Sequence, residues 1–382
     1  MGQECKKRIG IIGGGPAGCF CAYFLQNNFD VTVFDKNSPL KTLLPTGGGR
    51  CNLAPAVFDF KELVKNYPRG EKFLYSIFSQ FDVKETLEVF KKIGIETYTQ
   101  ADGRIFPVSE SSANVRKKLL NALNVEFVKD EVQKITYDDG CFIINDKKDY
   151  TFDVVVISTG GHASYNLIKR LGHTIILPKP SLIGLKTNFS TTELAGVTLK
   201  NVRAKIGKKN FCDDLLFTHK GISGPLIYKI SSIMAREVFP YVIILDFLGF
   251  EVDLQELFNK NPHKTLKNLL SEYLPKSFIS KIIDNSNIEC CKINSEMRKN
   301  IYNKLGMFPL VVTGTVGGGE TVTSGGVDLK EINPKTMMSK LIDNLYFCGE
   351  VIDVDGFCGG YNLQNCWSTA YVASQGIYFI NA

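Results

Sequence analysis

Short, wholly apolar runs alternate with glycine-rich turns at both ends of the chain. Near the N-terminus, residues 9–12 and 31–34 predict strands, and residues 17–25 between them predict a helix. The runs 154–157 and 345–347 are apolar at every position, which is typical of strands that are buried on both faces of a sheet. This order of elements predicts an α/β fold built on a parallel sheet.

The middle of the chain has a different pattern. Residues 186–251 and 308–335 form short strand-like segments between turn signals, so we expect an inserted β-rich, barrel-like domain. Residues 252–307 carry apolar side chains at helical spacing, and we expect them to form a small helical subdomain. The Rossmann-like domain then consists of residues 1–185 together with residues 336–382.

Two further segments carry local predictions. Residues 124–150 alternate apolar and polar positions around the turn signal at residues 138–140, which predicts antiparallel strands. Residues 222–232 predict a helix, opened by Ser223, Gly224 and Pro225, with proline in the first turn, where its missing N–H costs nothing.

The turn after the first strand carries the spacing Gly13-x-Gly15-x-x-Gly18. In a dinucleotide site the first glycine permits the tight turn, the second lets the backbone approach a pyrophosphate, and the third allows close contact between helix and sheet. The helix that begins near Pro16 and Ala17 would offer free N–H groups and the positive end of its dipole to the phosphates.

An acidic residue, Asp35, ends the second strand, and we expect it and the following Lys36 to contact the dinucleotide. A carboxylate at this point of the unit is placed to accept hydrogen bonds from the adenosine ribose. Strand, helix, second strand and acid agree, so the segment predicts a dinucleotide site. The motif alone leaves open whether the dinucleotide is NAD or FAD.

The segment "DNLYFCGEVIDVDGFCGGYNLQ" favours FAD. Gly349 and Glu350 follow a short apolar strand, where FAD-binding folds hold the ribityl chain. A helix predicted over residues 363–376 begins there, and its N-terminus would stabilise negative charge on the flavin pyrimidine ring. The residues expected at that end are Gly360, Tyr361, Asn362 and Leu363.

The stretch "LLPTGGGRCNLAP" is expected to run along the cofactor. Side chains at Gly48 and Gly49 would collide with it, Arg50 can offset phosphate charge or contact the flavin, and Asn52 can hydrogen-bond nearby. Cys51 has no partner cysteine in the local sequence, so we interpret it as a small residue near the cofactor, with direct redox chemistry as the alternative.

Further backbone contacts to the cofactor are expected from Thr159, Gly160 and Gly161, which close a buried strand. Val132 lies where related folds place a contact to adenine, and its alternative interpretation is an ordinary core valine.

A second glycine-rich stretch, "VTGTVGGGETVTSGGV", is followed by residues with strand character. No helix N-terminus is then available for phosphates, which disfavours a second dinucleotide site. We expect Thr323, Ser324 and Gly325 to lie near the flavin edge instead.

Catalytic side chains are not evident from the sequence. His162 and His219 are candidate acids or bases, and a structural or surface role is the alternative for each. The four histidines show no metal-ligand spacing, and the eleven cysteines include no C-x-x-C pair, so we expect no metal.

The chain resembles the bacterial YhiN/BaiN-like flavoproteins, a family also described as aminoacetone-oxidase-family FAD-binding enzymes. The resemblance is carried by "GGGRCN", "FTHKGISGP" and "GEVIDVDGFCGGYNLQ", which stand in the expected order. It implies an FAD-binding, glutathione-reductase-like domain interrupted by an insertion, in a cytoplasmic oxidoreductase. The loop after Gly161 is shorter than is usual in the family, so the substrate of a relative does not transfer directly.

The resulting expectation is an FAD-dependent oxidoreductase that exchanges a hydride with a small organic substrate. Amine or aminoketone oxidation and reduction of an enone-type C=C bond are both open, with NAD(P)H as a candidate transient electron donor. An FAD-dependent RNA-modifying enzyme and an FAD-binding protein without robust turnover are the alternatives. The formal charge of +6 is spread along the chain, so we expect no nucleic-acid partner, and no apolar run is long enough to predict a membrane span.

Overall fold

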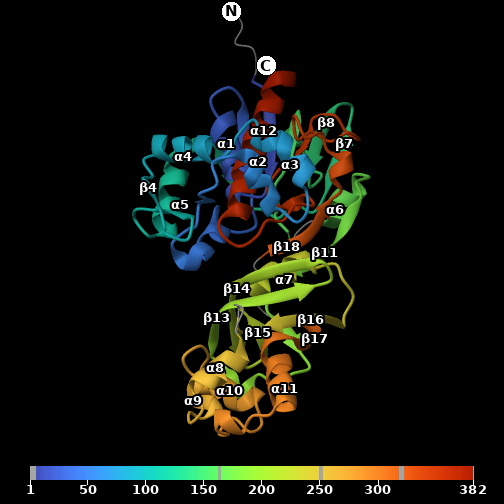
Figure 1. Ribbon diagram of the computed structural model, residues 1–382. Helices are drawn as coiled ribbons and strands as arrows, with labels where there is room; N and C mark the ends of the chain where they lie inside the picture. The colour runs from blue at the N-terminus through green and yellow to red at the C-terminus, as the bar shows by residue number, and fades with distance from the viewer. Residues whose placement is uncertain (1–5, 162–164, 249–252, 318–321, 382) are drawn as a thin grey trace, which may run out of the picture. The chain divides into compact units, whose positions relative to one another are not determined.

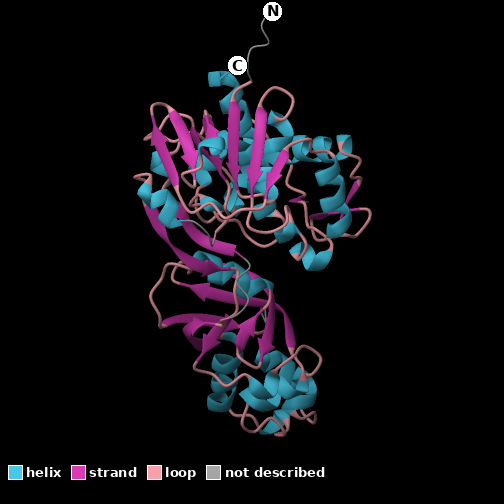
Figure 2. Cartoon of the chain, turned by 180° about the vertical axis from the view of Figure 1, so that it is seen from behind, coloured by secondary structure: helices cyan, strands magenta, loops and turns pink. Residues whose placement is uncertain are grey.

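The chain divides into two units, which are described separately. The computed structural model describes residues 6–161, 165–248, 253–317 and 322–381. Unit 1 comprises Met1–Lys179 and Val322–Ala382, and unit 2 comprises Pro180–Thr321. Figure 1 labels their helices and strands, and Figure 2 shows them by type.

A five-stranded parallel sheet in the order β19-β10-β1-β2-β6 lies at the centre of unit 1 (Figure 1). Its strands are β1 (Arg8–Ile12), β2 (Asp30–Phe34), β6 (Glu126–Val128), β10 (Val154–Ile157) and β19 (Leu345–Phe347). Every residue of β10 and β19 is buried, as the apolar runs predict for inner strands of a parallel sheet.

Two helices pack together beside this sheet. They are α1 (Pro16–Leu25) and α12 (Tyr361–Asn381), and the rings of Phe20 and Trp367 meet between them at 5.1 Å between centroids. Trp367 is fully buried and donates its indole N–H to the Leu53 carbonyl at 2.9 Å. The prediction ended α12 at Gly376, but a Cβ there would lie 2.4 Å from the Thr336 carbonyl oxygen. Gly376 therefore allows α12 to pack closely against Thr336, and the helix continues beyond it.

Smaller elements surround the parallel sheet of unit 1. Two three-stranded antiparallel sheets are present, β3-β5-β4 and β7-β8-β9. Their strands are β3 (Ala54–Pro55), β4 (Thr97–Thr99), β5 (Arg104–Pro107), β7 (Ile135–Asp138), β8 (Cys141–Ile144) and β9 (Thr151–Phe152). The remaining helices are α2 (Phe60–Leu63), α3 (Glu71–Phe78), α4 (Val83–Lys92), α5 (Ser112–Asn121) and α6 (Tyr165–Arg170).

The prediction of antiparallel strands over residues 124–150 is correct for β7 and β8 and wrong for β6. β6 pairs in parallel with β2, and Asp35 N–H donates to the Val128 carbonyl just beyond the pairing. β6 is an edge strand whose first two residues are exposed. Its polar positions therefore resemble those of a half-solvated antiparallel strand, although it completes the parallel sheet.

The boundary of unit 1 also differs from the sequence-based assignment. Residues 322–335 were expected in the inserted domain but belong to unit 1, where β18 (Val322–Val327) pairs with β11 (Ile175–Ser181). All six residues of β18 are buried, and a Cβ on Gly326 would lie 2.4 Å from the Val351 carbonyl oxygen. The two glycines of this strand thus permit close backbone packing in unit 1.

Unit 2 is built on a closed six-stranded barrel in the order β12-β15-β14-β13-β16-β17. Its strands are β12 (Leu185–Thr187), β13 (Thr198–Ile206), β14 (Lys209–Thr218), β15 (Gly221–Ser223), β16 (Tyr241–Asp246) and β17 (Phe308–Thr315). The predicted barrel-like insertion, and with it the α/β fold class, is confirmed.

Helices accompany the barrel in unit 2: α7 (Pro225–Ile233), α8 (Leu254–Lys260), α9 (Leu266–Leu270), α10 (Lys276–Ile282) and α11 (Ser295–Gly306). One hydrophobic cluster joins barrel and helices, and Phe278 of α10 packs on Phe217 of β14. The helix predicted over residues 222–232 starts later than expected. Ile222 and Ser223 belong to β15, and Gly224, with a φ of 94°, separates them from α7.

Candidate cofactor-binding site

The turn between β1 and α1 contains three glycines under different constraints. Gly13 has a φ of 107°, and a Cβ on it would lie 2.5 Å from the Ser158 carbonyl oxygen. A Cβ on Gly18 would lie 1.9 Å from the Gly13 carbonyl oxygen. Gly15 has an ordinary φ of −76°, and Thr42 Oγ1, at 3.6 Å, is the one described atom within 4 Å of a Cβ there. Two glycines are therefore required by the protein's own packing, whereas Gly15 borders open space.

The N-terminus of α1 lies at this open side of the turn. Pro16 and Ala17 open the helix, and its first turn contains no acidic side chain. The unpaired N–H groups and the positive end of the helix dipole are therefore available to an anion such as a pyrophosphate.

Asp35 lies against the same turn. Its Oδ2 accepts from the Gly14 N–H at 2.8 Å, and its Oδ1 accepts from the Asn37 N–H at 2.7 Å. A carboxylate has further acceptor capacity beyond these two bonds, so Asp35 can also accept from a sugar hydroxyl.

The residues after Asp35 meet a second segment of unit 1. Lys36 Nζ lies 3.0 Å from Glu131 Oε1 in an exposed ion pair, and the neighbouring Val132 is buried. Lys36 and Val132 were both predicted to contact the cofactor, and the structure brings them to the same end of β2 through this pair.

Thr159, Gly160 and Gly161 follow β10 and continue toward the C-terminal segment. Gly160 has a φ of 76°, and no described atom lies within 4 Å of where its Cβ would be. A Cβ on Gly161 would lie 2.6 Å from the Thr323 Cβ and 2.9 Å from Glu350 Oε1. Gly161 thus allows three distant segments to meet.

Glu350 lies where those segments meet. Its Oε1 accepts from the Thr323 N–H at 2.8 Å, and the Gly161 N–H also bonds to the carboxylate. Burial among protein atoms raises the pKa of Glu350 to about 7, since the two backbone hydrogen bonds offset only part of the loss of water. The preceding Gly349 has a φ of 77°, and a Cβ on it would lie 2.7 Å from the Ala17 Cβ of α1.

The glycine loop at residues 47–49 has left-handed backbone at each position, with φ values of 57°, 69° and 86°. No described atom lies within 4 Å of where a Cβ on Gly48 or Gly49 would be, so these two glycines border open space. Cys51 is fully buried, with its N–H bonded to the Thr46 carbonyl at 2.9 Å. Burial raises the pKa of the Cys51 thiol to about 12, which keeps it protonated and supports its interpretation as a small packing residue.

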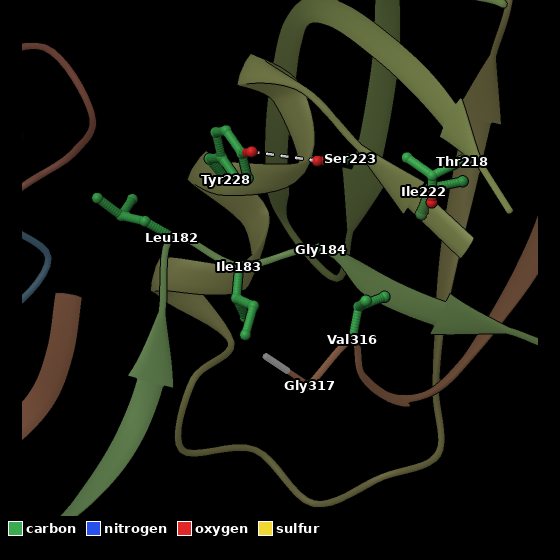
Figure 3. Close-up of a pocket in the computed structure, with 9 residues that line it drawn as sticks. All are labelled: Leu182, Ile183, Gly184, Thr218, Ile222, Ser223, Tyr228, Val316 and Gly317. Carbon is green, nitrogen blue, oxygen red and sulfur yellow. Dashed lines mark hydrogen bonds between the residues drawn. The ribbon is translucent and has the colours of Figure 1, made fainter. Parts of the chain in front are cut away.

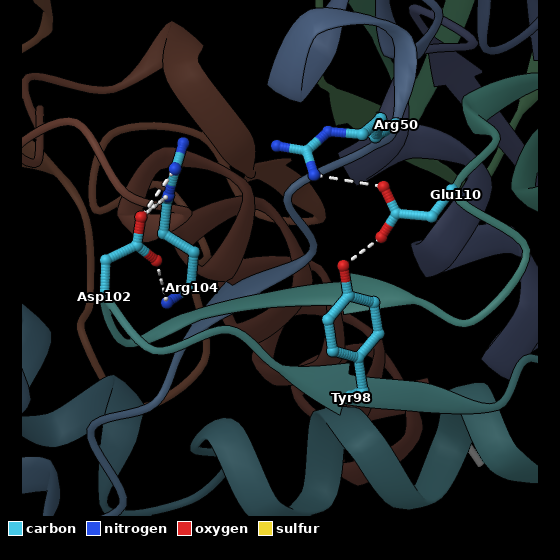
Figure 4. Close-up of polar contacts among 5 residues, drawn as sticks. All are labelled: Arg50, Tyr98, Asp102, Arg104 and Glu110. Atoms are coloured by element: carbon cyan, nitrogen blue, oxygen red, sulfur yellow. Dashed lines mark hydrogen bonds and ion pairs between the residues drawn. The ribbon is translucent and has the colours of Figure 1, made fainter.

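Arg50 points toward Glu110, in a polar cluster that also contains Tyr98 (Figure 4). Its Nη1 lies 3.0 Å from Glu110 Oε2, and its guanidinium lies 4.0 Å from the centroid of the Phe106 ring. The other oxygen of Glu110 accepts from the Tyr98 hydroxyl. The charge of Arg50 is therefore already paired within the protein, and Glu110 fixes its direction.

Asn52 joins the glycine loop to the start of α12. With its amide oriented to satisfy both neighbours, Oδ1 accepts from the Gly360 N–H at 3.0 Å and the amide nitrogen donates to the Ala54 carbonyl at 3.3 Å. A Cβ on Gly360 would lie 2.5 Å from the Ala54 carbonyl carbon. The two sequence motifs are therefore in contact.

The N-terminus of α12 is held by side chains from both ends of the chain. Asn362 accepts from the Gly356 N–H at 2.9 Å and donates to its carbonyl at 3.0 Å. The Tyr67 hydroxyl donates to the Tyr361 carbonyl at 2.7 Å, and Leu363 packs on the core. As in α1, the first turn contains no acidic side chain, so this helix end also suits a negatively charged group.

Comparison with known proteins identifies the family. The family model described as HI0933-like protein Rossmann domain matches residues 7–376. The chain belongs to this family. It is an FAD-dependent oxidoreductase, in agreement with the sequence-based expectation.

Three similar proteins span nearly the whole chain of this family member. The 3-dehydro-bile acid delta(4,6)-reductase of Clostridium scindens is 31% identical over 97% of this chain and 98% of its own. The ribosomal RNA dihydrouridine synthase of Escherichia coli is 29% identical over 96% of each chain. Among solved structures, a 3-ketosteroid delta1-dehydrogenase from Sterolibacterium denitrificans has a TM-score of 0.50 at 12% identity, covering 99% of this chain and 100% of its own, which shows a shared fold.

The residues of this site fit an FAD molecule. Gly15, Gly48, Gly49 and Gly160 border open space, and two helix N-termini without acidic side chains lie in the same unit. The buried hydroxyl of Tyr165 has no hydrogen-bond partner among the described residues. It lies close enough to Glu350 for an electrostatic interaction with that carboxylate. A bound group that brings phosphates and hydroxyls would complete this arrangement.

The two candidate histidines and the second glycine-rich stretch have different outcomes. His162 is outside the described residues, and His219 is exposed on the turn after β14. Thr323, Ser324 and Gly325 form part of β18, so the glycine-rich stretch before them does not lead into a helix. The described residues hold no His, Cys, Asp and Glu cluster suited to a metal, and none of the described helices is long and apolar enough to cross a membrane.

Sequence reasoning missed a buried ion pair beside the site. The carboxylate of Asp355 is fully buried and bonds to both Nε and Nη2 of Arg69, whose side chain is 13% exposed. The pair secures the loop between Glu350 and α12. No local signal could have shown it, because the partners lie 286 residues apart in the sequence.

Proposed function

We propose that the protein reduces a C=C bond conjugated to a carbonyl group in a small neutral ring compound, with FAD as cofactor and NAD(P)H as electron donor. The observation that carries the proposal is the chemistry shared by the names of two relatives that match nearly the whole chain. A 3-dehydro-bile acid with delta(4,6) unsaturation carries double bonds conjugated to a ketone. Dihydrouridine differs from uridine by saturation of a double bond conjugated to a ring carbonyl.

The residues of unit 1 would hold the cofactor by its charged and hydroxyl-bearing parts. The glycine turn and the N-terminus of α1 would receive the pyrophosphate, and Asp35 the ribose hydroxyls. Glu350, set between the N–H groups of Thr323 and Gly161, would face the ribityl chain. The N-terminus of α12 would lie at the flavin pyrimidine ring, where it favours negative charge.

When bound and reduced, FAD would supply a hydride, so that the protein itself contributes orientation and electrostatics. The hydride would add to the carbon β to the carbonyl and a proton from water to the α carbon, giving the saturated carbonyl compound. NAD(P)H would return a hydride to the flavin and leave as NAD(P)⁺. The overall reaction then consumes one NAD(P)H and one proton for each C=C bond that is reduced.

Anaerobic stopped-flow absorbance spectroscopy tests the proposal. The FAD-loaded protein is mixed with NADH or NADPH and then with 2-cyclohexen-1-one, 4-androstene-3,17-dione or ribosomal RNA. We expect a nicotinamide to bleach the flavin, an enone to restore its absorbance, and the product mass to rise by about 2 Da, the mass of two hydrogens. Bleaching by aminoacetone with no response to either nicotinamide would overturn the proposal in favour of an amine oxidase. A 2 Da gain confined to uridine in the RNA would overturn the small-molecule part of it.

A further inference from the structure

Unit 2 contains a pocket whose described lining residues all belong to that unit (Figure 3). Its volume is about 190 Å³, and it lies between the segment leading into β12, the strands β14 and β15, helix α7 and the end of β17. The described residues that line it are Leu182, Ile183, Gly184, Thr218, Ile222, Ser223, Tyr228, Val316 and Gly317.

The lining of this pocket combines apolar and polar surface in about equal parts, without a charged side chain among the described lining residues. Leu182, Ile183, Ile222 and Val316 supply aliphatic side chains, and no acidic residue, lysine, arginine or histidine is among the nine described lining residues. An ion that entered would lose water without gaining a counter-charge, which is costly. The pocket therefore selects against carboxylates and phosphates and favours a neutral ring.

The hydroxyl groups of the pocket are not equivalent. The Thr218 hydroxyl donates to the Gly221 carbonyl at 3.0 Å, so its proton is already used. The Ser223 hydroxyl donates to the Tyr228 hydroxyl oxygen at 3.2 Å, and Figure 3 shows the two side chains pointing toward each other. Two hydroxyls that share one hydrogen bond keep one proton between them for a ligand, and the bond within the pair strengthens the donation of that proton.

Local structure fixes the position of this hydroxyl pair. Ser223 ends β15, where it pairs with Leu216 of β14, and Gly224 then turns the chain into α7. The Tyr228 N–H bonds to the Gly224 carbonyl at 2.9 Å, one helical turn back. Strand and helix meet at a single glycine, so the two hydroxyls are held with little freedom.

We propose that this pocket binds the carbonyl-bearing ring of the substrate and that Tyr228 donates a hydrogen bond to the carbonyl oxygen. The proposal rests on the proposed function, from which the carbonyl is taken. An apolar cavity of about 150 Å³ accommodates benzene, so a cavity of about 190 Å³ accommodates one six-membered ring rather than a fused ring system. The ligand class is thus a neutral six-membered ring with a carbonyl group, alone or at one end of a larger molecule.

Isothermal titration calorimetry of the oxidised, FAD-loaded protein with 2-cyclohexen-1-one tests the pocket without turnover. We expect Tyr228→Phe to weaken binding about tenfold, since one hydrogen bond to the carbonyl is lost. Val316→Phe should weaken it further by filling the pocket. Tyr241→Phe, which alters another partly buried tyrosine of unit 2 outside the pocket, is the matched control and should bind as the wild type does. Benzoate, an anion of similar size, should bind at least tenfold more weakly than the enone.

Steady-state kinetics separates the two proposals. Tyr228→Phe should raise KM for the enone and lower kcat/KM about tenfold, while the rate of flavin reduction by NAD(P)H stays unchanged. If Tyr228→Phe binds the enone more weakly than the wild type does, but the wild type reduces no enone, the pocket is supported and the proposed function is overturned. Unchanged enone binding and kcat/KM in both Tyr228→Phe and Val316→Phe, with thermal unfolding like that of the wild type, overturns the pocket and leaves the proposed function standing.

Discussion

In unit 1 the candidate site is built from backbone and charge, whereas in unit 2 the pocket is built from neutral side chains. Gly13 and Gly18 leave no room for a Cβ, and the Glu350 carboxylate is held by N–H groups from two other segments. The nine described residues lining the unit 2 pocket carry no formal charge, and its polar groups are hydroxyls such as that of Tyr228. The first arrangement suits a ligand with phosphates and sugar hydroxyls, and the second suits a neutral ring.

This difference explains why the two sites are so unequally visible in the sequence. A backbone that must turn sharply or pack closely accepts glycine almost alone, so its constraint appears as a motif. A pocket lined by aliphatic and hydroxyl side chains uses residue types that also fill ordinary cores. The pocket forms where Leu182 and Val316 come together from distant parts of the chain, beside the closed barrel.

The largest expected effect concerns the buried charge in unit 1. Asp355→Asn removes a fully buried carboxylate that pairs with the largely buried guanidinium of Arg69. Breaking a buried ion pair in this way costs about 3 to 5 kcal/mol. We expect the free energy of unfolding, measured by urea denaturation, to fall by that amount.

The control for this variant is an exposed pair in the same unit. Asp102→Asn breaks the ion pair between Asp102 and Arg104 (Figure 4). The side chain of Asp102 is 47% exposed and that of Arg104 is 36% exposed. Exposed pairs contribute about 0 to 1 kcal/mol, so this change should be small. If Asp355→Asn and Asp102→Asn lowered the free energy of unfolding equally, the burial of the Arg69–Asp355 pair would not add to its contribution.

A pair of glycine variants tests whether the open side of the turn serves a ligand. Gly18→Ala puts a methyl group 1.9 Å from the Gly13 carbonyl oxygen, so the backbone must shift, and we expect a loss of about 3 kcal/mol in unfolding free energy. Gly15→Ala places its methyl group in open space and should cost about 1 kcal/mol or less. If the pyrophosphate approaches there, Gly15→Ala should still weaken FAD binding at least tenfold.

Thermal unfolding and flavin fluorescence titration measure the two properties separately. A Gly15→Ala protein that is stable and binds FAD like the wild type would show that the open side of the turn is not the phosphate site. A stable Gly18→Ala protein would mean that the helix can move away from β1 at little cost, against the packing described above.

How much the sequence predicts depends on the kind of constraint. The strands β1, β2, β10 and β19 and the start of α1 follow the predicted positions within a residue or so, because apolar runs and glycines fix them locally. β6 was misread because an exposed edge strand loses the apolar signature of its sheet. Most of residues 56–121, with helices α2 to α5, carried no prediction, since no motif marks them.

Within the candidate site, the same distinction holds. The glycines of the first turn and the residues that open α12 could be singled out by motif, although their binding of FAD remains a prediction. The ion pair between Arg69 and Asp355 could not, because its partners are 286 residues apart. Likewise, the hydrogen bond between Ser223 and Tyr228 depends on a strand-to-helix turn, where the sequence predicted a turn into a helix but not the strand β15.

The smallest expected effect concerns the protonation of Glu350, which sharpens the contrast with the uncharged pocket of unit 2. Its pKa of about 7 in the folded protein lies above the ordinary value of 4.5, so folding favours the protonated form. The contribution of Glu350 to the free energy of unfolding is therefore fully present below about pH 4.5 and is lost as the pH rises through about 7. Its full size is about 3 to 4 kcal/mol, because each pKa unit corresponds to about 1.4 kcal/mol, and about 2 to 3 kcal/mol of it is lost between pH 5 and pH 8.

Glu350→Gln keeps an acceptor for the Thr323 N–H but does not titrate. In urea unfolding of flavin-free protein, the wild type should therefore lose about 2 to 3 kcal/mol more than Glu350→Gln between pH 5 and pH 8. Parallel pH profiles for the two proteins would show that Glu350 is already ionised at pH 5, so that its backbone donors compensate fully for burial.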